Sequence, residues 1–340
     1  MRLLAMERGA IWEEVLERTL PQLAGAYSLV IATQDRLLGI RDPLGVRPLC
    51  LGRLRDGWVI ASESCALTTI GATYLREVYP GEAVLIDEKG MQSLRRKPKE
   101  GGFCLFEYVY LMRPDSILKG KYVYSARREI GRQLAREYPA QADLVMGIPD
   151  TATIAALGYA EEIGLPYQEG FIKNRYIQRT FIQPTQRRRD EEVHLKLNPV
   201  PDVLEGKRVV VVDDSIVRGT TTGPTINLLR KGGAREVHLR ICCPPYAHPC
   251  YLGINVATHE ELVAHRLSIP EIRDHVGADT LGYLSLERLI RATGRPASDF
   301  CVGCFTGRYP PSIVEAADGD TRLKIFGPGG DLYRVRIPGG

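Results

Sequence analysis

The residues best suited to chemistry lie in the stretch 209–222, which reads VVVVDDSIVRGTTT. Four valines form a short apolar run typical of a buried parallel strand, and the carboxylates of Asp213 and Asp214 follow it. A hydroxyl- and glycine-rich turn comes next, and a helical pattern begins near Pro224. Backbone N–H groups of such a turn and helix N-terminus bind phosphate, so the carboxylates must serve something else, such as ribose hydroxyls or hydrated Mg²⁺. The alternative is a strand that ends in a plain polar turn, which a lone Asp-Asp pair would favour.

A second polar segment of this kind is GIPDT at 147–151. It follows the apolar run ADLVM and precedes an alanine-rich helical pattern that ends near Ile163. Apolar residues share one helical face over 122–138, and EVHLRICC at 236–243 is a further strand-like run. Strands that alternate with helices predict an α/β fold, a doubly wound parallel sheet with helices on both faces. Ligands bind at the carboxyl ends of the strands in such sheets, so we expect the two polar segments to meet in one site.

The first part of the chain follows a β-rich pattern. Residues 1–20 form an amphipathic helical pattern, and residues 82–95 predict a hairpin with its turn at 88–90. A basic stretch at 95–102, RRKPKEGG, is typical of a solvated connector. Between helix and hairpin, Gly, Pro and Asp separate four strand-like runs, GAYSLVIAT (25–33), RLLGIRD (36–42), RPLCLG (47–52) and WVIASES (58–64). We therefore expect one domain over 1–98, a second over 99–315, and an unassigned tail over 316–340.

The composition of the 340 residues is that of an ordinary water-soluble protein, with 44% hydrophobic and 25% charged residues. No apolar run is long enough to span a membrane, and the N-terminus offers no clean signal peptide, so we expect a cytoplasmic protein without a membrane partner. The formal charge of +4 suits a phosphorylated substrate but gives no reason to expect nucleic acid as a partner.

Eight cysteines without a secretion signal predict thiols or metal ligands, not disulfides. Only Cys301 and Cys304 have a suggestive spacing, C-x₂-C, which suits zinc, an iron–sulfur cluster or chance. Spacing cannot join the distant Cys104 and Cys250 to them. Four others are expected to be small buried hydrophobic residues, namely Cys50, Cys65, Cys242 and Cys243.

At this point the sequence resembles a known family, the glutamine phosphoribosylpyrophosphate amidotransferases (amidophosphoribosyltransferases), and in particular their iron–sulfur-containing branch. The resemblance extends from about residue 20 to about residue 311. It is carried by RDPLGVRPL (41–49), GATYLREVYPGE (71–82), FEYVYLMRPDS (106–116), GIPDTAT (147–153), IKNRYIQRTFIQPTQ (172–186), VVVVDDSIVRGTT (209–221), PPYAHPCYLGIN (244–255) and CVGCFTG (301–307).

The resemblance implies a type I phosphoribosyltransferase fold and a reaction at C1 of phosphoribosyl pyrophosphate (PRPP). An amine from glutamine or ammonia gives 5-phosphoribosylamine and pyrophosphate, the first step of purine synthesis. The residues implied to bind PRPP are Asp150, Asp213, Asp214, Ser215, Ile216, Val217, Arg218, Gly219, Thr220 and Thr221. Those implied to hold Mg²⁺ are Thr151, Asp213 and Asp214, and those implied to act catalytically in a flexible lid that ends near Gln183 are Lys173, Arg175, Tyr176 and Arg179.

The resemblance also implies that a [4Fe–4S] cluster is bound by Cys104, Cys250, Cys301 and Cys304. Homo-oligomers and inhibition by purine nucleotides are common in the family, and neither is located by this sequence.

One departure concerns the glutaminase half of the family. The family begins with a cysteine that attacks glutamine, whereas this chain begins Met1-Arg2 and enters the pattern late. We therefore expect a partial glutaminase-type domain without a nucleophile, an incomplete sandwich with unpaired edges, and ammonia as the only usable donor. The alternatives are a PRPP-sensing regulator of the same fold, an inactive fragment or one subunit of a split enzyme, and a nucleobase phosphoribosyltransferase.

Overall fold

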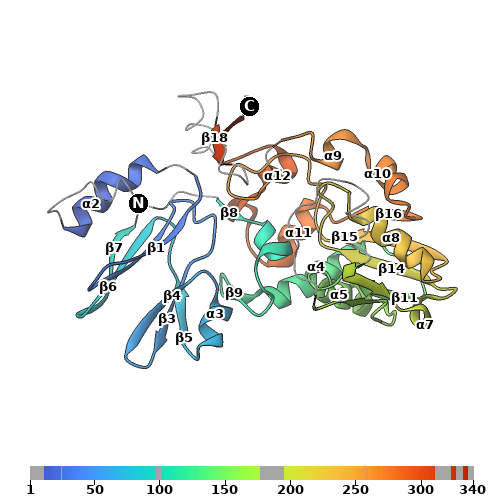
Figure 1. Cartoon of the computed structure of the whole chain (residues 1–340), viewed down its shortest axis with the longest axis horizontal. Helices are drawn as coiled ribbons and strands as arrows, with labels where there is room; N and C mark the ends of the chain where they lie inside the picture. Colours follow the sequence, from blue (N-terminus) through green and yellow to red (C-terminus); the bar gives the residue numbers. More distant parts are fainter. Residues whose placement is uncertain are drawn as a thin grey trace.

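Figure 1 shows the computed structural model of the chain, in which a β-rich N-terminal unit lies beside a larger α/β unit. The structure describes residues 11–23, 25–96, 98, 102–176, 195–256, 258–310, 323–326 and 332–335. The start of the expected N-terminal helix, Arg179 and the rest of the expected lid to Gln183 lie outside the described residues. In the described ranges, no helix has both the length and the apolar character needed to cross a bilayer.

The N-terminal unit contains two antiparallel sheets, of order β1-β2-β6-β7 and β4-β3-β5. The strands are β1 (Ser28–Ala32), β2 (Leu37–Arg41), β3 (Cys50–Leu54), β4 (Gly57–Ala61), β5 (Thr73–Glu77), β6 (Glu82–Asp87) and β7 (Gly90–Arg96). The four expected strand-like runs and the 88–90 hairpin are all present. The sequence pattern missed β5 and the short helix α3 (Ser64–Thr69) before it.

The alternating side chains of β2 and β6 explain why this unit is layered. Helix α2 (Trp12–Thr19) covers one face of the larger sheet, where Leu16 packs with Leu38. On the other face Val84 packs with Leu51 of the smaller sheet. Within the described residues, β1 and β7 each pair with one strand, so both are sheet edges. The expected packing of antiparallel sheets in this unit is confirmed.

The α/β unit is built on a parallel sheet of order β11-β14-β15-β16. Its strands are β11 (Leu144–Gly147), β14 (Arg208–Asp213), β15 (Glu236–Ile241) and β16 (Thr280–Tyr283). The four valines of β14 are fully buried, as expected for a central strand covered on both faces. The last strand, β16, was not predicted, because its sequence TLGY is too short to stand out.

Helices flank this sheet on both sides (Figure 1). They are α4 (Val123–Glu137), α5 (Thr153–Ile163), α8 (Thr222–Lys231), α10 (Ile269–Val276) and α11 (Leu286–Thr293). Helices α4 and α5 pack closely because each has a glycine at the contact: a Cβ on Gly131 would lie 1.8 Å from Ala155 O, and one on Gly158 would lie 1.9 Å from Arg128 O. The predicted doubly wound fold is confirmed, and the predicted α4 matches within one residue at each end.

Short elements join the two units and complete the chain. A π-helix, η2 (Glu107–Leu111), follows β8 (Phe103–Cys104), which pairs in parallel with β17 (Phe300–Cys301). Two further pairs are β9 (Ile117–Leu118) with β10 (Lys121–Tyr122), and β12 (Phe171–Lys173) with β13 (Leu197–Pro199). The remaining elements are η1 (Leu20–Gln22), α7 (Pro201–Leu204), α9 (Val263–Arg266), η3 (Ala297–Asp299), α12 (Gly303–Thr306), and the tail hairpin β18 (Leu323–Phe326) and β19 (Leu332–Val335).

Candidate active site and cysteine cavity

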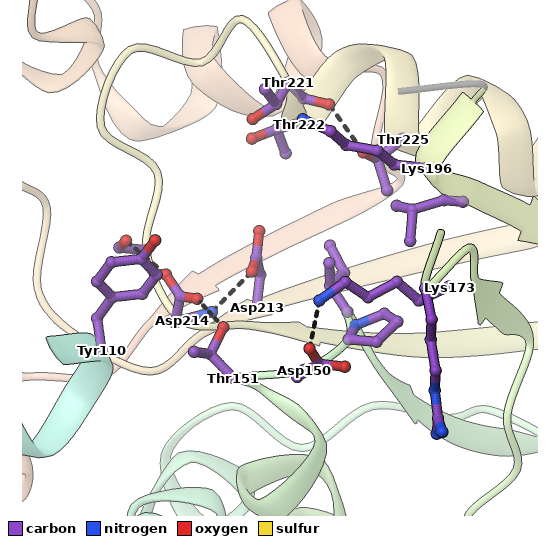
Figure 2. Close-up of a pocket in the computed structure, with 15 residues that line it drawn as sticks. Tyr110, Asp150, Thr151, Lys173, Lys196, Asp213, Asp214, Thr221, Thr222 and Thr225 are labelled. Atoms are coloured by element: carbon purple, nitrogen blue, oxygen red, sulfur yellow. Dashed lines mark hydrogen bonds and ion pairs between the residues drawn. The ribbon is translucent and has the colours of Figure 1, made fainter. Parts of the chain in front are cut away.

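A cavity of about 930 Å³ opens at the carboxyl ends of β11 and β14. Figure 2 shows that its labelled polar side chains come from both strand ends, from the start of α8, and from β12 and the segment before β13. Its lining is Tyr110, Ile148, Pro149, Asp150, Thr151, Lys173, Arg175, Lys196, Leu197, Asp213, Asp214, Ser215, Thr221, Thr222 and Thr225. The two polar segments of the sequence therefore meet in one site, as their strand-end positions predicted.

The acidic pair lies at the centre of this cavity. Asp213 ends β14, and its Oδ1 accepts a 2.8 Å hydrogen bond from the Asp214 backbone N–H. Asp214 is 9% exposed, and its two carboxylate oxygens accept hydrogen bonds from Ser215 Oγ at 2.7 Å and Thr151 Oγ1 at 2.5 Å. Burial, and then the charge of Asp214, raise the pKa of Asp213 well above its usual value. A divalent cation would relieve this repulsion, and oxygen donors of these types suit Mg²⁺.

Cations stand on the opposite side of the cavity, at the end of β12. Lys173 Nζ contacts the Asp150 carboxylate (Figure 2). Arg175 also lines the cavity. Lys196 enters from the neighbouring segment, where its carbonyl accepts the Asn174 N–H at 2.8 Å. A polyanionic ligand in this cavity would therefore meet positive charge at one end and carboxylates at the other.

The start of α8 forms a third wall of hydroxyl groups. Thr222 and Thr225 are buried, and Thr225 Oγ1 donates to Thr221 O at 2.8 Å. The N-terminus of a ten-residue helix carries unpaired N–H groups and the positive end of the helix dipole. This wall can bind a phosphate, as the sequence predicted for the turn before α8.

The side chains in the middle of the expected phosphate loop do not line the main cavity. Ile216 is 1% exposed in the core, Val217 packs against that core, and Arg218 pairs with Glu261. Arg218, Gly219 and Thr220 line a separate hollow of about 680 Å³ on the outer side of α8. Of the loop 215–221, only its two ends, Ser215 and Thr221, line the main cavity. Apolar Ile and Val follow Ser215, and their burial turns the loop away from the cavity.

Tyr176, predicted to act in the lid, is 99% exposed and does not line the cavity. Conversely, sequence reasoning gave no role to Tyr110, Lys196 and Thr225, which do line it. Tyr110 stood in a segment that carried the family resemblance, and Thr225 lies one helical turn after Thr221. These two positions were the signals in the sequence that could have identified Tyr110 and Thr225 as residues of the site.

Tyr110 is held at the cavity by the π-helix η2. Arg127 of α4, 3% exposed, donates to Tyr108 O at 2.9 Å and to Met112 O at 2.7 Å, at the C-terminal end of η2. Burial lowers the pKa of Arg127, and the negative charge of Asp214 opposes that effect. A buried cation therefore braces the segment that brings Tyr110 to the carboxylates.

The four cysteines implied by the resemblance converge on a second, small cavity of about 20 Å³. Cys104 and Cys301 are register partners in the β8–β17 pair, Cys304 lies in α12, and Cys250 lies in the loop after β15. Cys250 Sγ accepts backbone N–H groups of Leu252 and Ile254, both at 3.4 Å. Burial raises the pKa of Cys301 to about 11 and also raises the pKa values of Cys104 and Cys304.

This donor set fits an iron–sulfur cluster. Four cysteine sulfurs around one cavity, with N–H groups directed at one of them, are the ligand type and hydrogen bonding that such clusters use. In the described ranges, the side chains as they stand form no group of three or more His, Cys, Asp or Glu that could hold a single metal ion, so the fit rests on the common cavity and the thiol chemistry. The other four cysteines are buried elsewhere, as predicted: Cys50, Cys65, Cys242 and Cys243.

A parallel sheet that places an acidic pair, a helix N-terminus and three cations around one strand-end cavity defines the class as a type I phosphoribosyltransferase. A family model described as "Phosphoribosyl transferase domain" matches residues 114–252, and one described as "Glutamine amidotransferase domain" matches residues 4–69. The amidophosphoribosyltransferase of Bacillus subtilis is 49% identical over 308 residues, 89% of this chain and 65% of that protein. That of Methanocaldococcus jannaschii is 48% identical over 318 residues, 88% of this chain and 67% of that protein.

Solved structures agree with these sequence relatives. The B. subtilis glutamine PRPP amidotransferase complexed with ADP and GMP has a TM-score of 0.84 and 47% identity, covering 91% of this chain and 69% of its own. A structure of the allosteric regulatory enzyme of purine biosynthesis gives the same TM-score and identity, with 68% of its own chain covered. The chain belongs to the amidophosphoribosyltransferase family. It spans about half to two thirds of the length of the curated relatives it matches, 51% of the Glycine max chloroplastic protein at the low end.

Proposed function

We propose that this chain binds Mg²⁺–PRPP in the strand-end cavity and transfers an amine to C1 of the sugar, giving 5-phosphoribosylamine and pyrophosphate. The observation that carries the proposal is the hydrogen bond from Thr151 to Asp214, which joins the two polar strand ends beside a cluster of cations. Family membership supports the same reaction.

The chain's own residues have distinct tasks in this reaction. Asp213 and Asp214 would bind the ribose hydroxyls and, with the Thr151 hydroxyl, hold Mg²⁺, which when bound neutralises charge on the leaving pyrophosphate. The threonines at the start of α8 would bind the 5-phosphate. Lys173 and Arg175 would face the pyrophosphate, whose negative charge grows as the bond to C1 breaks. No general acid is required for such a leaving group.

Further proposals concern the remainder of the molecule. The cysteine cavity would hold a [4Fe–4S] cluster that ties the C-terminal segment to the start of the α/β domain. We place a partial glutaminase-type domain at 1–98, the transferase domain at 99–315 and a tail at 316–340. We also propose a cytoplasmic homo-oligomer that purine nucleotides inhibit, since one solved relative is complexed with ADP and GMP.

Isothermal titration calorimetry with Mg²⁺–PRPP tests the substrate assignment. We expect saturable binding that Asp214→Asn weakens by about 1–3 kcal/mol, because a charged acceptor of two hydrogen bonds is lost. Asp35→Asn, in an exposed turn of the N-terminal unit, is the matched control and should bind as the parent does. Equal affinity of the parent and Asp214→Asn would remove the acidic pair from the site.

A further inference from the structure

Arg47 of the N-terminal unit connects both candidate sites. Its Nη1 donates to Glu107 Oε1 at 2.8 Å, and its Nη2 donates to the Leu252 carbonyl at 3.3 Å. The side chains of Arg47 and Glu107 are only 21% and 5% exposed. One guanidinium therefore joins the start of η2 to the loop that carries Cys250.

The segment around Arg47 is part of the wall of the cysteine cavity. Val46 lines that cavity, and its carbonyl accepts the Cys104 N–H at 3.2 Å. A Cβ on Gly253 would lie 3.5 Å from Arg47 Nη2, so the guanidinium lies directly against the Cys250 loop. Leu252, whose carbonyl accepts from Arg47, also donates its N–H to Cys250 Sγ at 3.4 Å. The guanidinium is thus a cation held against the loop that carries Cys250.

The other end of this connection reaches the PRPP cavity. Glu107 is the first residue of η2 and Tyr110 lines the cavity, while Arg127 holds the carbonyls of Tyr108 and Met112 on either side of Tyr110. A π-helix is an uncommon element, frequent at functional sites, and here Arg47 contacts its first residue while the buried Arg127 holds its second residue and the residue after its end. A change at Glu107 would therefore be transmitted to the position of Tyr110.

We propose that Arg47 is a positioning residue that supplies the positive charge for the ligated cysteines and, through Glu107, sets the position of Tyr110 in the PRPP cavity. This inference rests on the proposed function for the substrate and on the cysteine cavity for the metal group. The planar fork of arginine suits the task, because it binds Glu107 and the Leu252 carbonyl at the same time. The N-terminal unit thereby contributes directly to both sites.

Iron retention tests the role toward the cysteines. The full chain, purified without oxygen and loaded with iron and sulfide, is dialysed against an iron chelator. We expect Arg47→Met to retain iron about 10- to 100-fold less well, as is typical when a residue that supports the metal ligands from outside is lost. We also expect its midpoint reduction potential to become more negative. Arg47→Lys keeps the charge and should retain iron and midpoint near the parent's. Arg36→Met, which removes an exposed arginine of the same unit, is the control.

Binding of Mg²⁺–PRPP to the same iron-loaded preparations tests the role toward Tyr110. Lysine lacks the fork that binds Glu107 and the Leu252 carbonyl at the same time, and Glu107→Gln removes the ion pair, but both variants spare the positive charge. Both should therefore bind PRPP about tenfold more weakly, with iron retention unchanged. Parent-like PRPP affinity in both variants would overturn the link to Tyr110. Parent-like iron retention and midpoint in Arg47→Met would overturn the charge role. Failure of the parent itself to bind PRPP would contradict the proposed function instead, and the iron measurements would still decide the charge role.

Discussion

The Thr151 hydroxyl and Asp214 Oδ2 lie 2.5 Å apart although 63 positions separate them in the chain. Thr151 comes two residues before α5, and Asp214 directly follows β14. The parallel pairing of β11 with β14 brings their ends together, so the contact depends on strand register. A one-residue slip of either strand would send the side chains to opposite faces of the sheet.

Thr151→Val tests this contact, since valine keeps the shape of threonine and removes the hydroxyl. We expect the affinity for Mg²⁺–PRPP to fall by about 1–2 kcal/mol, because Asp214 loses a donor and the metal loses an oxygen ligand. Calorimetry measures the change. Thr69→Val removes a hydroxyl that binds Cys65 O in remote α3 and serves as the control. Equal losses in both variants would contradict a specific role for Thr151.

The sequence was sufficient for the central strand and for helices α4, α5 and α8. The valine run of β14 and the Ala-rich pattern of α5 are continuous apolar stretches, and most of their residues are buried in the structure. The short strand β16 and the π-helix η2 were missed, because local propensity does not distinguish a four-residue strand or a five-residue π-turn. The formation of these two elements depends on contacts with neighbouring parts of the fold, which the local sequence does not show.

The site was predictable only where its residues share a motif. The positions directly after the predicted strands identify Asp213, Asp214 and Thr151 as residues of the site. Lys196 comes from a segment with no motif of its own. The meeting of Cys104 with Cys301 depends on a two-residue parallel pairing that no spacing in the sequence reveals. For the cysteines, the family resemblance supplied what physical reasoning on sequence could not.

Gly131→Ala should destabilise the α/β unit. Alanine in a helix normally stabilises by up to about 1 kcal/mol relative to glycine, but here its Cβ would overlap the Ala155 carbonyl of α5. We expect a net loss of about 3 kcal/mol and a lower melting temperature by calorimetry. The control is Gly57→Ala, where the nearest atom would be 3.5 Å away. A Gly131→Ala variant that melts at or above the parent's temperature would show that α4 and α5 can separate without cost.

The Asp143–Arg208 pair should make stability depend on pH. Hydrogen bonds from the Arg208 side chain and backbone lower the pKa of Asp143 from 3.8 to about 2. A depressed pKa means that the carboxylate's contribution is complete above the unfolded-state value and is lost as pH falls through about 2. Urea unfolding should therefore show the parent more stable than Asp143→Asn at neutral pH, with the difference shrinking in acid. A difference that grows below pH ~4 would contradict this assignment.

Cys301→Ser should remove iron from the protein. The parent, purified without oxygen, should be brown with about four irons per chain, and the variant should lose the colour and part of its solubility. Cys65→Ser, at a buried cysteine outside the cavity, should keep the iron. Zinc in place of iron would indicate a structural zinc site. A parent without any metal would contradict both the iron–sulfur cluster and the zinc site.

The last prediction concerns the amine. The transferase site needs a neutral nitrogen with a free lone pair beside C1 of PRPP, and ammonia can supply it whereas ammonium cannot. Pyrophosphate release from Mg²⁺–PRPP with an ammonium salt should therefore rise with pH. Asp213 acts in the same direction, since its raised pKa leaves it more often protonated in acid, where cation binding weakens. PRPP affinity measured at each pH separates the two effects: the ammonia dependence must persist at saturating PRPP. Asp214→Asn, which is expected to bind PRPP more weakly, should release less pyrophosphate at the same subsaturating PRPP concentration. A preparation that binds PRPP but releases pyrophosphate equally with and without ammonia would be a hydrolase, and the proposed transfer would be wrong.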